Sequence, residues 1–357
     1  MLQVGIVGLP NVGKSTLFKT LTKKQVPCEN FPFCTIEPNV GIVEVPDERL
    51  QALAKVSKSQ KVITAAIQFV DIAGLVAGAH KGEGLGNKFL ANIREVDMIA
   101  HVVRAFKDSN VHHVSGDVDP MRDVEIIELE LAMADLDTVE KRLNNLHGKM
   151  KTGKTKEVEE EDDALQKIVA ALKTGKPTRE VELTDEEKLA IKGLELLTLK
   201  PVLYIINVDE TTAADPDWKS PLSGDRLALP LSVKIESEIM EMPADEQVVF
   251  LESLGLKQSG LDRMIIKCYE LLDLITFLTS GEKESRAWTI KKGTKAPQAA
   301  GTIHTDFEKA FICAEILDWQ DFVNLGEAGA REAGKLRVEG KNYVMQDGDV
   351  CNFKVGV

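Results

Sequence analysis

The chain has 357 residues, of which 43% are hydrophobic and 28% charged, a balance that excludes a mainly disordered protein and allows two or three domains. Its net charge of −13 argues against a protein that coats nucleic acid by charge alone, and we expect no DNA partner. The five cysteines are scattered, and no apolar stretch approaches the roughly 18 residues of a membrane span. We therefore expect a cytoplasmic protein with no membrane partner.

The first predicted element is a strand at residues 2–7, and a complete phosphate-loop motif follows it. Gly8 to Ser15 match the pattern G-x-x-x-x-G-K-[ST] at every fixed position. In this motif backbone N–H groups point at phosphate oxygens, the lysine reaches the β- and γ-phosphates and the serine hydroxyl binds Mg²⁺. The motif predicts nucleoside triphosphate binding. The contacting residues expected here are Asn11, Val12, Gly13, Lys14, Ser15 and Thr16.

A strand at 66–70 ends in Asp71-Ile-Ala-Gly74, the second phosphate-site signal. An acid at the end of such a strand lies beside the phosphate loop and can hold Mg²⁺, while Gly74 lets a backbone N–H approach the γ-phosphate. Between the two motifs, Thr35 lies in a Pro-rich segment and is the expected further ligand of Mg²⁺ when the γ-phosphate is present. The predicted metal ligands are therefore Ser15, Thr35 and Asp71.

Further strands are expected at 40–45, 99–104, 202–206 and 229–232, and their alternation with helical segments predicts a doubly wound α/β sheet. Residues 121–198 interrupt this alternation with long polar, helix-favouring sequence. One apolar stripe with helical spacing runs through it. Its members are Leu129, Met133, Leu136, Val139, Leu143 and Leu146. Thr184-x-x-Glu187 is a candidate capping box for an antiparallel return helix.

The turn of this helical insertion is divided by charge. Six Lys or Arg and no acid lie between residues 141 and 156, and six acids follow between 157 and 163. The basic stretch is either a face for RNA phosphates or a solvated helix tip. After helices expected over 236–277, strands at 287–290, 311–316 and 350–355 with a turn at Asp347-Gly348 predict a small α+β domain. The stretch from Arg286 to Lys295 carries four basic residues and no acid, and is a candidate contact surface.

Five segments resemble those of the Obg-like ATPases of the YchF subfamily, within the translation-factor-related phosphate-loop GTPases. They are GLPNVGKSTLF (8–18), NFPFCTIEPN (30–39), FVDIAGLVAGA (69–79), KGEGLGNKFL (81–90) and NVDE (207–210). The C-terminal part resembles a TGS domain. The resemblance implies a nucleotide domain at 1–120 and 199–278, an inserted helical coiled-coil arm at 121–198 and a β-grasp (TGS) domain at 279–357. It also implies ATP hydrolysis in preference to GTP, and contact with ribosomes or ribosomal RNA.

The residues expected to read the base depart from the usual GTPase motif. In Asn207-Val208-Asp209-Glu210, Val208 replaces the lysine of Asn-Lys-x-Asp and Glu210 replaces its final aspartate. A displaced carboxylate loses the bidentate contact to guanine, whereas backbone groups of Val208 can pair with adenine. We therefore predict that ATP binds at least as tightly as GTP. The base and γ-phosphate contacts expected beyond the phosphate loop are Gly74, Asn207, Val208, Glu210 and Ser232.

The residue that orients the attacking water is not obvious. The position after Asp-x-x-Gly is Leu75, which can neither donate nor accept a hydrogen bond, so we predict slow unstimulated turnover. The resemblance points to His113 for this role, with His80 as the alternative; the predicted catalytic residues are Lys14 and His113. The carbonyl of Asn11 is a candidate ligand for K⁺. Two rival functions stay open, a true GTPase that assembles ribosomes and a non-hydrolysing scaffold ordered by nucleotide.

Overall fold

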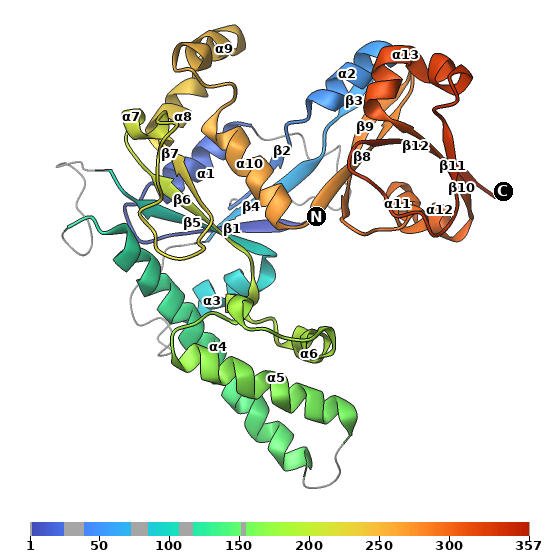
Figure 1. The fold of residues 1–357 in the computed structure, drawn as a ribbon. Helices are drawn as coiled ribbons and strands as arrows, with labels where there is room; N and C mark the ends of the chain where they lie inside the picture. The colour runs from blue at the N-terminus through green and yellow to red at the C-terminus, as the bar shows by residue number, and fades with distance from the viewer. Residues whose placement is uncertain (1, 25–38, 73–84, 107–116, 151–154, 357) are drawn as a thin grey trace. The chain divides into compact units, whose positions relative to one another are not determined.

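The computed structural model describes residues 2–24, 39–72, 85–106, 117–150 and 155–356 (Figure 1). Contacts within the chain separate two compact units. The first holds Met1–Lys23, Pro38–Gly41 and Gln68–Leu261, and the second holds Lys24–Glu37, Ile42–Ile67 and Asp262–Val357. This division groups residues 42–67 and 262–278 with the C-terminal residues, whereas the sequence assigns both segments to the nucleotide domain.

A six-stranded sheet has the order β2-β4-β1-β5-β6-β7, and it belongs to the first unit except for residues 42–44 of β2 and the first two residues of β4. Its strands are β1 (Gln3–Val7), β2 (Val40–Glu44), β4 (Ala66–Asp71), β5 (Met98–Arg104), β6 (Val202–Asn207) and β7 (Ala228–Leu231). The pairs of β1 with β4 and β5, of β5 with β6, and of β6 with β7 are parallel. The predicted α/β fold class is therefore confirmed, and every strand expected in this part of the sequence is present.

The central strands form because their sequences are apolar on both faces. Each residue of β5 is buried, which is the pattern of a parallel strand covered by helices on both sides. The helices of this unit outside the insertion are α1 (Lys14–Lys23), α3 (Leu85–Glu95), α7 (Glu210–Ala213), α8 (Val233–Ile239) and α9 (Ala244–Ser253), and α10 (Gly260–Leu271) begins at its border. Since parallel strands all end at one edge, the polar residues after β1, β4, β6 and β7 meet there.

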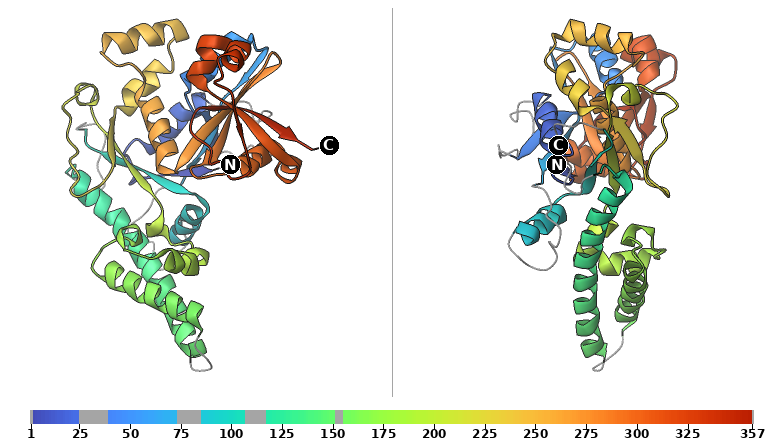
Figure 2. Two further views of the ribbon diagram at one scale, coloured as in Figure 1. Left: turned by 45° about the vertical axis from the view of Figure 1, so that its right-hand side comes forward. Right: turned by 90° about the vertical axis from the view of Figure 1, so that its left-hand side faces the viewer.

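The insertion contains two long helices, α4 (Pro120–Met150) and α5 (Lys156–Lys173), which run side by side (Figure 2). Val139, Leu146 and Ile168 are buried between them. The predicted stripe is correct from Leu136 onward, since the last four of its six residues pack in this core, whereas Leu129 and Met133 are 60% and 37% exposed. The short segments η3 (Thr178–Glu180), α6 (Asp185–Ile191), η4 (Lys192–Leu194) and η5 (Leu197–Leu199) lead back to the sheet.

The return helix begins earlier than expected. It starts at Lys156, and the acidic run 157–163 fills its first two turns, where negative charge favours the helix dipole. The capping box is present, with the Thr184 side chain bonded to the Glu187 N–H and the Glu187 side chain bonded back, but it opens the short helix α6. A capping box marks a helix start without determining which helix it starts, so the prediction of the return helix at Thr184 was wrong.

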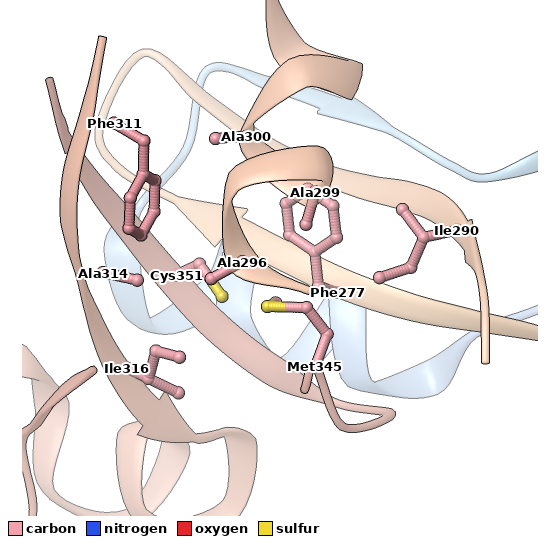
Figure 3. Packing of buried hydrophobic residues seen from close by; sticks show 10 residues of the cluster. All are labelled: Phe277, Ile290, Ala296, Ala299, Ala300, Phe311, Ala314, Ile316, Met345 and Cys351. Carbon is pink, nitrogen blue, oxygen red and sulfur yellow. The ribbon is translucent and has the colours of Figure 1, made fainter. Parts of the chain in front are cut away.

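The second unit has its own six-stranded sheet, in the order β11-β10-β12-β8-β9-β3. Its strands are β3 (Lys61–Ile63), β8 (Leu274–Ser280), β9 (Glu284–Lys291), β10 (Phe311–Asp318), β11 (Arg337–Glu339) and β12 (Asp349–Val355). The helices are α2 (Glu48–Ser57), α11 (Ala296–Ile303), α12 (Thr305–Lys309) and α13 (Trp319–Glu332). Figure 3 shows alanines of α11 facing Phe277 and Cys351 in a close-packed core.

Two features of this sheet differ from the sequence prediction. Residues 274–277, expected in a helix, begin β8 and pair with β9 from Leu274↔Lys291 onward. A short apolar run can form either a helix or a strand. Here its antiparallel pairing with β9 makes it a strand. The three-residue strands β3 and β11 were not predicted; β3 pairs in parallel with β9, and β11 pairs antiparallel with β10. No helix in the described part of the chain combines the length and apolarity that crossing a membrane requires.

Candidate nucleotide-binding site

The phosphate loop connects β1 to α1 and depends on close backbone approaches. Asn11 and Gly13 have φ values of 63° and 100°, in the left-handed region that favours Gly and Asn. A Cβ on Gly13 would lie 2.5 Å from the Asn207 amide nitrogen, and one on Gly8 would lie 2.6 Å from the Val102 carbonyl oxygen. Both glycines are therefore required by packing against neighbouring strands, in addition to any role in binding phosphate.

The structure brings together the two predicted phosphate-site charges. Strand β4 pairs with β1 so that Asp71 lies opposite Ile6, and its carboxylate contacts the Lys14 ammonium group. Both side chains are largely shielded from solvent. A pocket of about 590 Å³ opens at this point. It is lined by Leu9, Pro10, Asn11, Gly13, Lys14, Ser15, Thr16 and Asp71.

The donor set of this pocket suits a hard cation. The Ser15 hydroxyl and the Asp71 carboxylate are oxygen ligands of the kind that Mg²⁺ prefers, and Mg²⁺ takes its remaining ligands from phosphates and water. No group of three His, Cys, Asp or Glu residues among the described positions forms an all-protein metal site. Thr35 and Gly74, predicted to complete this site, lie outside the described residues.

Asn207 holds the base side of the site together. Its side-chain nitrogen donates to the Val12 carbonyl (2.9 Å), and its side-chain oxygen accepts from the Val233 N–H (3.2 Å). Through these two hydrogen bonds the buried amide joins the phosphate loop to the start of α8. A second pocket of about 690 Å³ adjoins it, and Val208, Glu210 and Ser232 are among its lining residues.

The acids that follow β6 are both engaged. The Asp209 carboxylate caps α7 by accepting from the Thr212 N–H (2.9 Å) and the Thr211 hydroxyl (2.8 Å), and these hydrogen bonds lower its pKa. Glu210 pairs with the Lys234 ammonium group at 3.0 Å. Glu210, which replaces the base-reading aspartate of Asn-Lys-x-Asp, is therefore paired with Lys234. The motif alone does not indicate this partner.

One backbone expectation at the base site is wrong. The Val208 N–H donates to the Leu231 carbonyl at 3.0 Å, as part of the pairing between β6 and β7. It therefore does not supply the donor to adenine N1 that the sequence suggests. The Val208 carbonyl oxygen stays the candidate acceptor for the adenine 6-amino group.

Sequence reasoning also missed Phe106, which lines the base pocket just after β5. The buried Arg104 guanidinium lies 4.4 Å from the centre of its ring and donates to its carbonyl oxygen at 3.2 Å. The sequence did contain a signal for this position. Phe106 is an aromatic residue two positions after a buried strand, and that strand ends at the same edge of the sheet as the phosphate loop.

The described histidines lie away from both pockets. His101 is buried within β5, as the strand pattern predicts, and burial lowers its pKa from 6.5 to about 4. His147 contacts Asp162 at 2.8 Å between α4 and α5, and His304 caps α12. The water-orienting candidates His113 and His80, and also Leu75, lie outside the described residues.

Two family models match the chain. Residues 3–130 match a model described as a 50S ribosome-binding GTPase, and residues 274–356 match YchF-GTPase_C, described as a protein of unknown function. Among curated proteins, the chain is 52% identical to the ribosome-binding ATPase YchF of Bacillus subtilis (strain 168), covering 100% of both chains. It is 50% identical to the protein of the same name from Pasteurella multocida (strain Pm70), covering 99% of both.

A solved structure agrees with these sequence matches. The YchF GTPase of Schizosaccharomyces pombe superposes with a TM-score of 0.88 at 42% identity, covering 99% of this chain and 97% of that one. The phosphate loop, the strand-end Asp71 and the altered base motif occur in a chain that is similar from end to end to these proteins. This chain therefore belongs to the YchF family of phosphate-loop nucleoside triphosphatases.

Proposed function

We propose that this chain is an Mg²⁺-dependent nucleoside triphosphatase that hydrolyses ATP, and GTP less well, as a slow switch on ribosomes. The observation that carries the proposal is the contact of Lys14 with Asp71 in a pocket that Ser15 also lines. A cation, a carboxylate and a hydroxyl beside a helix N-terminus are what Mg²⁺-assisted phosphoryl transfer requires. The names of the relatives, ribosome-binding ATPases, support the substrate and the partner.

The metal would be held by Ser15 and Asp71, with Thr35 as the further protein ligand. When bound, Mg²⁺ neutralises charge that develops on the transferred phosphoryl group. With nucleotide bound, Lys14 would leave Asp71 and contact the β- and γ-phosphates, and Gly74 would offer its N–H to the γ-phosphate. Of the predicted contacts Asn11 to Thr16, all but Val12 line this pocket, and they would surround the phosphates from the loop and the first turn of α1.

For the attacking water, the proposal assigns His113, with His80 as the alternative. His113→Ala is expected to lower single-turnover hydrolysis while leaving nucleotide affinity nearly unchanged, the pattern of an interaction made in the transition state. An unchanged rate would move the role to His80, which the same measurement on His80→Ala addresses.

The carbonyl of Asn11 is assigned to K⁺ placed beside the phosphates, where a monovalent cation supplies part of the charge of an arginine finger. The left-handed backbone at Asn11 fits a loop shaped by this residue. Equal hydrolysis rates in KCl and NaCl at matched ionic strength would dispose of this assignment.

Selection of the base rests on the two engaged carboxylates. Guanine recognition needs a carboxylate that accepts N1–H and the 2-amino group together, but Asp209 caps α7 and Glu210 pairs with Lys234. A lost bidentate contact costs roughly 1–3 kcal/mol, enough to remove most guanine preference. Adenine needs no carboxylate; its 6-amino group can donate to the Val208 carbonyl.

Titration with labelled nucleotides and single-turnover hydrolysis test the proposal together. We expect ATP to bind at least as tightly as GTP and to be hydrolysed faster, and Glu210→Asp alone to leave GTP selectivity unrestored. GTP bound about tenfold more tightly than ATP would support the GTPase alternative. Tight binding of both nucleotides without hydrolysis would support the scaffold alternative.

A ribosome contact is assigned to the basic stretch that begins at Lys291, the last residue of β9. Lys291, Lys292 and Lys295 are exposed, and no carboxylate among the described residues pairs with them. The backbone of Lys295 pairs with that of Val344 in an isolated β-bridge. The exposed Lys341 lies three residues before Val344, in the loop that this pairing brings beside Lys295. Arg286, predicted for the same surface, instead lies over the Trp288 ring at 4.0 Å. Such a group of cations on an acidic protein fits RNA phosphates.

The proposal keeps three functional parts. They are the nucleotide domain (1–120 and 199–278), the coiled-coil arm (121–198) and the C-terminal TGS domain (279–357). The two long helices of the insertion and the separate C-terminal sheet support the arm and the TGS domain. A partner as large as the ribosome also supports the cytoplasm as the place of action.

A further inference from the structure

A cluster of charged and polar side chains lies where α4 meets the nucleotide-binding sheet. Its centre is Glu128 of α4. One carboxylate oxygen accepts from the Arg179 guanidinium (3.0 Å) and from the Tyr204 hydroxyl, and the other accepts from the Arg226 guanidinium (2.8 Å). These partners come from η3, from β6 and from the segment just before β7, so one side chain of the insertion holds three separate parts of the first unit.

The cluster is shielded enough for its charges to matter. Glu128 is 18% exposed, and Arg179 and Arg226 are 21% and 22% exposed. Burial opposes ionisation of Glu128, but hydrogen bonds from Arg226 and Tyr204 and the charges of both arginines outweigh it and lower its pKa. The carboxylate is thus ionised at neutral pH. Removing it would leave two cations facing each other without compensation, which drives the surrounding segments apart.

Two of these partners lie on, or just before, the strands that carry the base pocket. Tyr204 is on β6, and three residues later Asn207 bonds the phosphate loop and the start of α8. Arg226 lies two residues before β7, and Ser232, which lines the same pocket, directly follows that strand. The two segments also join each other at this level, since the Tyr204 N–H donates to the Leu227 carbonyl at 3.0 Å.

We propose that Glu128 is a positioning residue that holds the middle of β6 and the segment before β7 against the arm helix α4, and so couples the arm to nucleotide affinity at the far ends of these two strands. This inference rests on the proposed function, since it concerns the same pocket. Coupling is reciprocal: a partner that displaces α4 changes nucleotide affinity, and bound nucleotide changes how α4 is held.

The experiment compares Glu128→Ala and Glu128→Gln with the parent protein in titrations with labelled ATP and GTP. We expect Glu128→Ala to bind ATP at least about fivefold more weakly, which is the lower end of measured couplings between sites. We also expect the ratio of ATP affinity to GTP affinity to change. Glu128→Gln keeps an acceptor oxygen but no charge, and should fall between. Arg226→Gln is a milder variant, because it removes one contact and leaves the Glu128 carboxylate paired with Arg179. It should also weaken ATP binding, by less than Glu128→Ala.

The matched control is Glu161→Ala. Glu161 pairs with Arg142 (2.9 Å) between α4 and α5, on the same arm but without contact to β6 or β7. It should lower thermal stability and leave both nucleotide affinities unchanged. The proposal is overturned if the Glu128 and Arg226 variants lose stability as this control does while ATP and GTP affinities stay at parent values. Failure of the parent protein to bind ATP would instead contradict the proposed function itself.

Discussion

Lys14 makes the contact on which the phosphate site depends, since its ammonium group and the Asp71 carboxylate meet within one pocket. In Lys14→Ala the developing charge on the phosphates loses its main side-chain cation. We expect hydrolysis to fall by about 10²–10³-fold or more, the cost of removing one preorganised donor. Single-turnover assays measure this. Lys19→Ala, on the exposed face of the same helix, is the control and should match the parent. A Lys14→Ala enzyme at the parent rate would contradict the assignment of the site.

His101 makes stability depend on pH. It faces Glu128, Arg179 and the Tyr204 ring, and burial lowers its pKa from 6.5 to about 4. The folded chain therefore keeps His101 neutral where the unfolded chain binds a proton, so stability from this residue is complete above pH 6.5 and is lost as the pH falls toward 4. Between pH 7 and 5 the parent should lose about 2 kcal/mol relative to His101→Leu, which cannot titrate. Urea denaturation at both pH values gives the difference. Parallel losses in the two proteins would show that another group is responsible.

At the scale of elements, a second, buried carboxylate joins the arm helix α4 to η5, the segment that leads back to the sheet. Asp135 of α4 accepts from the N–H groups of Leu197 and Thr198 (2.9 and 2.7 Å) and from the Thr198 hydroxyl (2.6 Å). Asp135 is 1% exposed, and its burial raises its pKa against the effect of these hydrogen bonds. Asp135 thus holds the middle of α4 against η5, while Glu128 holds the same helix against β6 and the segment before β7.

Asp135→Ala should therefore be strongly destabilising. Three buried donors lose their acceptor, and each unsatisfied donor costs roughly 1–3 kcal/mol. We therefore expect the free energy of unfolding, measured with urea, to fall by at least about 3 kcal/mol. Asp137→Ala changes an exposed acid of the same helix and should stay within about 0.5 kcal/mol of the parent. Equal stabilities for the two variants would mean that α4 is held mainly by its apolar contacts.

At the scale of the whole molecule, the net charge of −13 makes a local basic surface stand out. Each lysine that neutralises a phosphate contributes about 0.7–0.9 to the slope of log affinity against log salt. We predict that Lys291→Gln, Lys292→Gln and Lys295→Gln combined weaken ribosome co-sedimentation and lower this slope by about 2–3. The control changes three lysines that pair with carboxylates, Lys267, Lys335 and Lys354, to Gln. Equal losses in both triple variants would remove the assigned surface.

The sequence by itself determined the features that depend on local order. The phosphate loop, the strand ending in Asp71, the positions of the six strands of the first sheet and the capping box at Thr184 all follow from short-range spacing, because a motif needs only its own residues in series. The family and its altered base motif also follow from these segments.

Tertiary structure alone decided the features that join distant segments. The pair of Glu210 with Lys234, the use of the Val208 N–H by β7 and the cluster at Glu128 each connect residues far apart in the chain. The same holds for β3, whose three residues acquire their strand from β9. Hydrogen bonds and ion pairs of this kind are set by which elements pack together, so periodicity and spacing in one sequence carry no record of them.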